Sequence, residues 1–330
     1  MNYRKFGKTD LLVSETGFGA WAIGGAAMSN GMAIGWGKTD DGESVKALET
    51  AFENGINFYD TADFYGIGHS EDLIGKTFGN SDKVIIASKV GQKPGLIKPV
   101  DVDYSKPYML SACNASLKRL QRDCIDYYQL HIAHLEHLQQ GECIEAMEQL
   151  KKEGKIRYWG ISIFTFNPFP EAEFIMDNHL GHGFQLVFNI INQKAYPLLQ
   201  RMKEQGYGII ARMPLQFGLL AGKFNTQSQF DEMDHRSFRL TPEIIDNTNQ
   251  LLEPAWLMAE KYNISKAQLA LSYILSYPEI STVIPGIRTP EQAIKNTQPF
   301  TQLSHEEKIF LHSLYENKLQ DLLTLMQKQG

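Results

Sequence analysis

The sequence predicts an α/β protein that folds as one (β/α)8 barrel, a TIM barrel, over residues 1–330. Eight short apolar segments alternate along the chain with stretches that have the apolar period of a helix, which suits a closed barrel in a chain of this length. A doubly wound open sheet is disfavoured because the first segment leads into a long loop, and no glycine-rich turn there opens a helix. We expect strands at residues 16–21, 57–62, 84–90, 125–131, 158–162, 184–189, 207–213 and 282–286.

The stretches between these strands have the pattern of amphipathic helices. Leu110, Cys113 and Leu117 stand at positions i, i+3 and i+7, so they share one helix face. Ser265 and Thr289 each precede a Gln by three residues, which is a capping signal at a helix start. Several of the strands are apolar on both faces, as expected of parallel strands that helices cover.

Three segments exceed a minimal barrel. Residues 2–14 predict an N-terminal hairpin, and residues 215–240 form a long loop after the seventh strand. Residues 304–328 predict a C-terminal helix that covers the barrel. Its apolar face consists of Leu311, Tyr315, Leu319, Leu322 and Met326.

The composition narrows the classes of partner. The chain has 38 acidic and 32 basic residues, a net charge of −6, and no basic tract, which argues against nucleic acid. No apolar run approaches the roughly 18 residues of a membrane span. Three cysteines without CxxC spacing, and an N-terminus without a signal-peptide pattern, favour a cytoplasmic protein. The oligomeric state stays open.

Four side chains with complementary chemistry follow strand ends, where functional groups of such barrels gather. Asp60 lies toward the end of the second strand and Tyr65 follows it, Lys89 lies at the end region of the third, and His131 ends the fourth. A nearby ammonium lowers the pKa of a phenol, so Lys89, paired with Asp60, would make Tyr65 a useful proton donor. A neutral His131 would orient a carbonyl oxygen. Without a visible nucleophile, the attacking group is expected to be a cofactor hydride.

The order of motifs around these residues resembles the aldo-keto reductase family. The run GINFYDTADFYG at residues 55–66 carries most of the resemblance, and GHSEDLIG at 68–75 continues it. The pair at 88–89, DYYQLH at 126–131, GIS at 160–162 and IPGIR at 284–288 follow in the family's order. The resemblance spans residues 3–298. It implies NADPH-dependent reduction of an aldehyde or ketone to an alcohol, with Asp60, Tyr65, Lys89 and His131 as the catalytic residues.

The resemblance also implies where NADP(H) binds. Ser162 and Gln185 match positions that hold the nicotinamide carboxamide, whereas Ile163 replaces the family's usual Asn, with Asn189 as a substitute donor. Arg212 replaces a stacking aromatic ring, and we hypothesise that its charge favours NADPH over the cationic NADP⁺.

The pyrophosphate and the 2′-phosphate need cations. Lys223 lies in the loop that resembles the family's pyrophosphate-binding segment, and Arg288 precedes a capped helix start, which favours anions and hence NADP(H) over NAD(H). The predicted cofactor contacts are Trp21, Ser162, Gln185, Arg212, Leu215, Gly218, Lys223, Gly286, Arg288, Gln292 and Asn296.

The substrate pocket and the competing functions complete the predictions. Trp21, Phe64, Phe164 and Phe217 are aromatic residues of loops near the barrel mouth that would line an apolar pocket. The first alternative function is a cofactor-sensing subunit, because potassium-channel β subunits are similar to aldo-keto reductases. The second is a metal-dependent hydrolase that uses His131, Asp60 and Asp63. We expect no metal, because Lys89 beside these residues would repel a dication and His134 and His137 fall in a polar loop.

Overall fold

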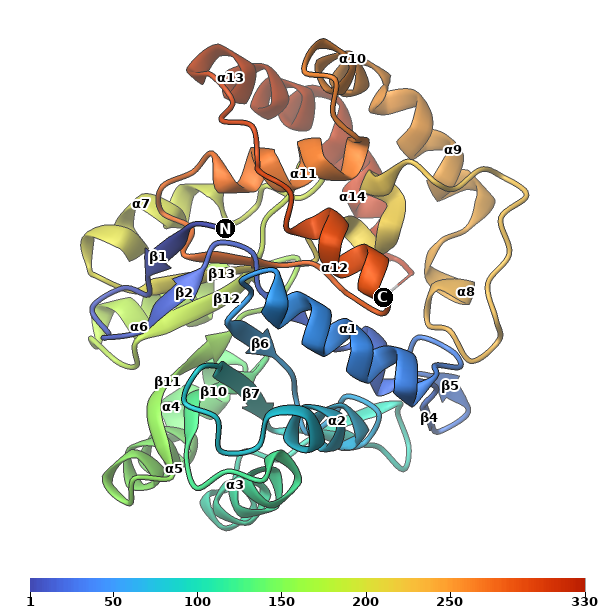
Figure 1. The fold of residues 1–330 in the computed structure, drawn as a ribbon. Helices are drawn as coiled ribbons and strands as arrows, with labels where there is room; N and C mark the ends of the chain where they lie inside the picture. Colours follow the sequence, from blue (N-terminus) through green and yellow to red (C-terminus); the bar gives the residue numbers. More distant parts are fainter. Residues whose placement is uncertain (330) are drawn as a thin grey trace.

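The structure is a computed structural model that describes residues 1–329. All eight expected barrel strands are present in it, and they form one parallel sheet (Figure 1). In the sheet β14 is followed by β13, β12, β11, β10, β7, β6 and β3, and the parallel bridges Thr16–Val283 and Gly19–Gly286 join the two ends. The predicted fold class is therefore confirmed. The strands are β3 (Phe18–Gly19), β6 (Phe58–Asp60), β7 (Ile85–Val90), β10 (Ile125–His131), β11 (Ile156–Ser162), β12 (Gly183–Val187), β13 (Gly208–Arg212) and β14 (Thr282–Ile284).

Helices surround this sheet, and α12 packs against α1 where the first and last strands meet (Figure 1). The capping box predicted at Ser265 is present, since its hydroxyl accepts from the Gln268 amide at 3.1 Å and the Gln268 side chain accepts from the Ser265 amide at 3.0 Å. The helices are α1 (Asp41–Glu53), α2 (His69–Phe78), α3 (Lys106–Leu120), α4 (Leu135–Gln140), α5 (Glu142–Lys152), α6 (Phe169–Asp177), α7 (Tyr196–Glu204), α9 (Pro242–Leu251), α10 (Glu253–Lys261), α11 (Lys266–Leu275) and α12 (Pro290–Asn296).

The predicted N-terminal hairpin closes the lower end of the barrel. β1 (Tyr3–Lys5) and β2 (Leu12–Ser14) pair antiparallel. Phe6, between them, is fully buried, and its ring lies 4.9 Å from that of Tyr127 and 6.4 Å from that of Phe58. A side chain at Gly208 would collide with the Phe6 ring, since its Cβ would lie 2.6 Å away. The barrel interior is thus packed from below by the hairpin.

Loops at the mouth carry short elements that the sequence did not reveal. The loop after β3 contains the 3₁₀ helix η1 (Ala22–Gly24) and the hairpin of β4 (Met28–Ser29) and β5 (Met32–Ala33). Residues 215–240 contain the 3₁₀ helix η2 (Gln216–Ala221) and α8 (Arg236–Arg239), and α8 lies near the β4–β5 hairpin in Figure 1. A further hairpin joins β8 (Gln92–Pro94) to β9 (Val100–Val102).

The predicted C-terminal helix is interrupted by a π-helical turn. It consists of α13 (His305–Leu314), the π-helical η3 (Tyr315–Leu319) and α14 (Gln320–Gln327). Its predicted apolar face is buried from Leu311 to Met326, so it covers the barrel as expected. Met326 reaches the mouth, where its sulfur lies 3.7 Å from the Gln216 side-chain nitrogen.

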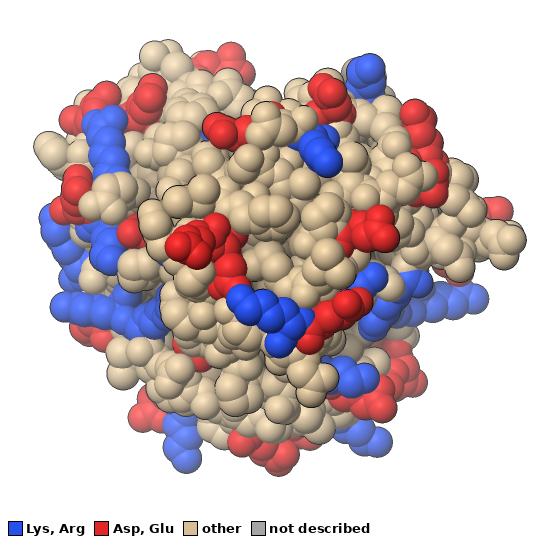
Figure 2. All heavy atoms as spheres, turned by 90° about the horizontal axis from the view of Figure 1, so that it is seen from above, with Lys and Arg blue, Asp and Glu red and all other residues tan. Residues whose placement is uncertain are grey.

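The surface seen from above in Figure 2 carries Lys and Arg side chains interspersed with Asp and Glu on a largely uncharged background. Each helix of residues 1–329 is too short or too polar to span a bilayer.

Candidate active site

Three neighbouring strands bring the predicted catalytic side chains to the barrel mouth. Asp60 ends β6, Lys89 is the penultimate residue of β7, and His131 ends β10. Tyr65 lies in the turn between β6 and α2. The next residue, Gly66, has φ of 60°, and a Cβ there would lie 2.1 Å from the Gly24 carbonyl oxygen. Glycine at this position therefore lets the Tyr65 turn pack against the loop after β3.

Lys89 is the centre of the cluster. Its side chain is fully buried, and its Nζ lies 2.6 Å from Asp60 Oδ2, 3.1 Å from Tyr65 Oη and 2.8 Å from the Thr61 carbonyl oxygen. Burial by itself lowers the pKa of Lys89, but the attraction of Asp60 and Tyr65 outweighs it, so this pKa lies above its ordinary value. The ammonium is therefore charged and in contact with the phenol.

Two glutamines complete the environment of Asp60. Its Oδ1 accepts hydrogen bonds from Gln185 Nε2 at 2.7 Å and from Gln129 Nε2 at 3.1 Å. Sequence reasoning missed Gln129, although it stands two residues before His131 on the same strand and therefore faces the same interior. Gln185 and Ser162, the two predicted nicotinamide contacts, are hydrogen-bonded to each other: the Ser162 hydroxyl donates to Gln185 Oε1 at 3.5 Å.

Tyr65 is a neutral phenol in this arrangement. Burial raises the pKa of Tyr65 more than the Lys89 charge lowers it, so the pKa lies above its ordinary value. The Lys89 charge lowers the pKa of Tyr65 in the expected direction, but burial costs the phenolate more than this one ammonium returns. Tyr65 stacks on Trp21, with ring centres 5.7 Å apart, and it retains its proton for donation.

His131 faces Tyr65 from β10, which is separated from β6 by β7 in the sheet. The two ring centres are 5.9 Å apart, and the Tyr104 hydroxyl holds the His131 carbonyl at 2.6 Å. Burial, followed by the charges of Lys89 and Arg212, holds the pKa of His131 well below its usual range, so the ring is neutral as predicted. Its buried Nδ1 has no hydrogen-bond partner in residues 1–329. The neutral ring is therefore suited to hydrogen-bonding a ligand oxygen.

A cavity of about 800 Å³ opens above these groups. All four predicted substrate residues, Trp21, Phe64, Phe164 and Phe217, line it. Lys89 lies behind Tyr65 and does not line it, and neither does Asn296, which is buried at the end of α12. The other predicted residues that line the cavity are Asp60, Tyr65, His131, Ser162, Gln185, Arg212, Leu215, Gly218, Lys223, Gly286, Arg288 and Gln292.

Arg212 has no carboxylate partner among the described residues. One guanidinium nitrogen donates to the Ile163 carbonyl at 3.2 Å and to the Thr165 hydroxyl at 3.0 Å, whereas its buried Nε has no partner. Asn189, the suggested substitute for the missing amide contact, donates instead to the Met213 carbonyl at 2.9 Å and to the Gln216 side chain at 2.8 Å. That suggestion is therefore wrong, since the amide of Asn189 already holds the loop after β13.

This loop has an unusual backbone. Met213, Gln216 and Phe217 have φ of 52°, 44° and 58°, in the left-handed region that side chains other than glycine rarely adopt. Gly218 follows with φ of 99°. Such strain is concentrated at binding sites, and here it places the Phe217 ring in the mouth.

Arg288 connects two predicted features of the mouth. Its guanidinium donates to the carbonyls of Trp36 at 3.3 Å and Lys38 at 2.6 Å, and its backbone N–H donates to the Gln292 side chain at 2.7 Å. The predicted cap of α12 is present, since the Thr289 hydroxyl accepts from the Gln292 amide at 3.3 Å. Arg288 thus joins the loop after β3 to the start of α12.

An aromatic cluster covers the mouth, and sequence reasoning missed its central residue, His235. The backbone N–H of His235 donates to the Gly35 carbonyl at 3.0 Å. Its ring stacks on Trp21 at 4.5 Å and meets Trp36 at 4.7 Å and Phe217 at 4.9 Å. Burial lowers the pKa of His235 to about 3, so the ring is neutral. Only the fold brings residues this far apart in sequence together.

The acids of the alternative hydrolase site do not converge. Asp60 Oδ2 is held by Lys89, and Asp63 does not line the cavity. Burial and the neighbouring Glu71 raise the pKa of Asp63 well above its usual range. Within residues 1–329, no group of three or more His, Cys, Asp or Glu side chains is placed to hold a metal ion.

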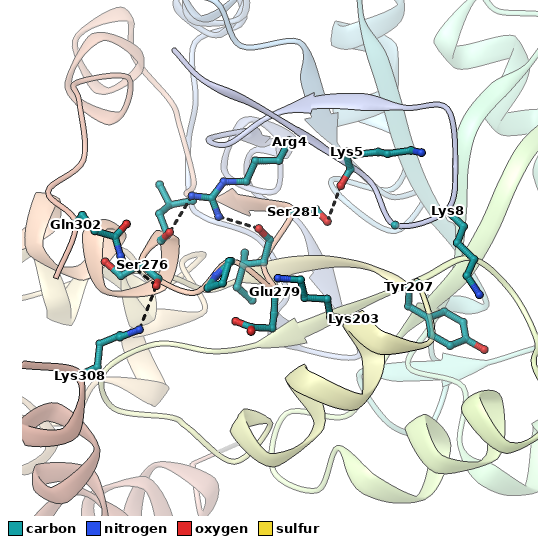
Figure 3. A pocket seen from close by; sticks show the side chains of 15 residues that line it. Arg4, Lys5, Lys8, Lys203, Tyr207, Ser276, Glu279, Ser281, Gln302 and Lys308 are labelled. Carbon is teal, nitrogen blue, oxygen red and sulfur yellow. Dashed lines mark hydrogen bonds between the residues drawn. The ribbon is translucent and has the colours of Figure 1, made fainter. Parts of the chain in front are cut away.

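A second cavity, of about 660 Å³, lies at the opposite end of the barrel, beside the N-terminal hairpin (Figure 3). Lys5, Lys8, Lys203 and Lys308 lie around it. Arg4 donates from there to the carbonyls at the end of α11 and in the turn that follows, with distances of 2.8 Å to Leu275, 3.3 Å to Tyr277 and 2.9 Å to Ile280.

Comparisons with known proteins agree with this geometry. The chain is 30% identical to YqkF of Bacillus subtilis, an oxidoreductase itself uncharacterized, over 98% of each chain. It is 27% identical to a Schizosaccharomyces pombe protein provisionally designated a voltage-gated potassium channel subunit beta, over 90% of this chain and 87% of that protein. The holo form of the aldo-keto reductase AKR11C1 from Bacillus halodurans has a similar structure, with a TM-score of 0.77, 29% identity and coverage of 95% and 96%.

The family model for the Aldo/keto reductase family matches residues 15–315, which include every barrel strand and all four predicted catalytic residues. The chain therefore belongs to the aldo/keto reductase family and is an oxidoreductase of that family.

Proposed function

We propose that this protein reduces an aldehyde or ketone to an alcohol with NADPH. The observation that carries the proposal is the contact of a charged Lys89 with both Asp60 and the neutral Tyr65, beside a neutral His131, on the floor of an apolar cavity. Such a site donates a proton to an oxygen and holds that oxygen in place.

The residues of the cavity fit a nicotinamide dinucleotide. A cavity of about 800 Å³ is large enough for an extended ligand. Gly286 lines it, and a Cβ there would meet nothing closer than Ala22 Cβ at 3.9 Å, so backbone and ligand can approach closely. Ser162, Gln185, Lys223 and Arg288 are the residues proposed to hold the cofactor.

The bound cofactor supplies the hydride that adds to the carbonyl carbon. Tyr65 gives its proton to the carbonyl oxygen, and the positive charge of Lys89 stabilises the phenolate that remains. Asp60 keeps Lys89 charged and in place. His131 donates a hydrogen bond that directs the oxygen toward Tyr65.

The test follows the absorbance of NADPH with a panel of small aldehydes and ketones. The native protein is expected to consume NADPH, and Tyr65→Phe is expected to lose activity roughly 10²- to 10⁴-fold while it still binds NADPH. A native protein that turns over none of the panel contradicts the proposal.

The similarity to a designated channel subunit supports a second candidate, a cofactor-binding subunit that acts through a partner protein. Such a protein would bind NADPH and yet show negligible turnover. Co-purification with one stable partner chain, together with absent turnover, favours this candidate over the reductase.

A further inference from the structure

The mouth cavity contains more positive than negative charge. Asp60 is the only acidic residue among the described residues that line it, and it is paired with Lys89. Arg236 is paired with Asp234 at 2.6 Å. The remaining cations that line the cavity are Arg212, Lys223, Arg239 and Arg288.

Arg239, the last residue of α8, is the least satisfied of these cations. Its side chain forms no hydrogen bond and no ion pair with any of residues 1–329, and its Nε is buried without a partner. Its guanidinium lies only against aromatic rings, 5.4 Å from the centre of Phe217 and 5.3 Å from that of Phe238. The side chain is half-buried, with its Nε enclosed. A cation that is partly withdrawn from water and has no counter-charge is stabilised by an anionic ligand.

The position of Arg239 places this anion near the reacting groups. Arg239 and Arg212 line the same cavity. The Arg239 guanidinium lies over the Phe217 ring, whose centre is 6.5 Å from that of Trp21, and Trp21 stacks on Tyr65 with ring centres 5.7 Å apart. Burial, followed by the Arg212 charge, lowers the pKa of Arg239 to about 10. Lys223 and Arg288 are already proposed to hold the phosphates of the cofactor. An anion at Arg239 and Arg212 therefore belongs to the molecule whose carbonyl meets Tyr65.

We propose that Arg239, with Arg212, forms a subsite for a carboxylate of the substrate, so that the preferred substrates are short aldehydes or ketones that carry a carboxylate. This proposal rests on the proposed reductase function. Phe217 and Phe238 flank the guanidinium and withdraw part of it from water, which strengthens a charge-assisted hydrogen bond to a carboxylate.

The test compares 4-oxobutanoate with 4-oxobutanamide, which has nearly the same shape and no charge. The native protein is expected to prefer the carboxylate in kcat/KM by at least about tenfold. Arg239→Met, which retains an apolar side chain beside Phe217, is expected to lose that preference, and Arg239→Lys is expected to restore part of it. Equal kcat/KM values for the two substrates with the native protein overturn the proposal.

Two binding measurements keep the outcomes distinct. NADPH binding, followed by fluorescence, is expected to be similar for the native protein and Arg239→Met. A tenfold or greater weakening of NADPH binding with an unchanged substrate preference assigns Arg239 to the cofactor's pyrophosphate and overturns the proposal. Calorimetric titration of butanoate into the NADPH complex tests the subsite without turnover. Butanoate binding that Arg239→Met abolishes supports the subsite even if neither aldehyde is reduced, a result that would refute only the reductase function.

Discussion

The two ends of the barrel carry cavities of similar size and opposite character. At the C-terminal mouth, several buried polar atoms lack partners within residues 1–329, such as Arg212 Nε, Arg239 Nε and His131 Nδ1. At the N-terminal end, Arg4 is held by three backbone carbonyls, and Lys5, Lys8 and Lys203 are exposed to solvent.

Whether buried polar atoms have hydrogen-bond partners distinguishes a cavity suited to a ligand from one whose polar groups stabilise the fold. An exposed lysine is hydrated and gains little from an anion, whereas a half-buried guanidinium with an enclosed, unpaired Nε gains more. Cavity volume alone, about 800 against 660 Å³, does not distinguish the two ends. What distinguishes them is whether buried polar groups already have partners.

The largest expected contrast comes from removing one ammonium at each end. Lys89→Met is expected to lower kcat for carbonyl reduction by roughly 10²- to 10⁴-fold, because Tyr65 loses the charge that stabilises its phenolate. Lys203→Met, at the exposed rim of the lower cavity, is expected to leave kcat unchanged. Steady-state kinetics of both variants, with circular dichroism to verify folding, make the comparison. Similar losses in the two variants would refute the distinction between the ends.

The aromatic cluster of the mouth is expected to give the protein an acid-sensitive stability. His235 has a folded-state pKa of about 3 because of burial, against an ordinary value of 6.5. Below pH 6.5 the unfolded state binds the proton more readily, so stability falls as the pH drops from 6.5 toward 3, by about 1.4 kcal/mol per pH unit.

His235→Phe removes the contribution of His235 to this dependence, so its free energy of unfolding is expected to fall less steeply than that of the native protein between pH 6 and pH 4. Urea unfolding over that range measures the slope. His305→Gln, a change at an exposed histidine, is the control and is expected to behave like the native protein. Parallel pH profiles for the native protein and His235→Phe would contradict the expectation.

Arg288 tests whether the mouth recognises the 2′-phosphate of the cofactor. Arg288→Met is expected to weaken NADPH binding about 10- to 100-fold more than NADH binding, because charge-assisted hydrogen bonds contribute about 1.5–3 kcal/mol each. Its contacts with the Trp36 and Lys38 carbonyls affect both cofactors, so the ratio of the two dissociation constants is the informative quantity. An unchanged ratio would assign Arg288 to the loop alone.

The smallest effect is expected from Arg4 in the lower cavity. Arg4→Met removes donors from the Leu275 and Ile280 carbonyls and is expected to lower the free energy of unfolding by about 2 kcal/mol without changing kcat. Lys5→Met, whose side chain is exposed, is the matched control and should change stability by less than about 0.5 kcal/mol. A fall in kcat for Arg4→Met would connect the lower cavity to the chemistry.

Much of this architecture could be predicted from local patterns. Asp60, Lys89 and His131 were found because each follows or ends an apolar strand, and parallel strands share one functional edge. Gln129 could have been found by the same rule, since it faces inward two residues before His131. The strand periodicity therefore carries more information about the site than the motif residues alone.

The remaining features depend on distant parts of the chain. His235 stacks on Trp21, and Arg288 holds Trp36 and Lys38, but no local pattern relates these positions. The direction of the Tyr65 pKa also required the fold, because the extent of burial decides between two opposing effects. Sequence patterns predict which side chains lie near the mouth, whereas the packing around them decides their protonation and their hydrogen-bond partners.

The closure of the barrel has a consequence for its dynamics. β3 and β14 are joined by the Thr16–Val283 and Gly19–Gly286 bridges, and the Gly19 amide donates to the Pro285 carbonyl at 2.9 Å. Gly19 and Gly286 both line the mouth, so a ligand seated there spans this seam. Amide hydrogen exchange at Gly19 and Ile287 should therefore slow when the cofactor binds. The exchange rate at this seam between the first and last strands would then report how much of the protein has cofactor bound.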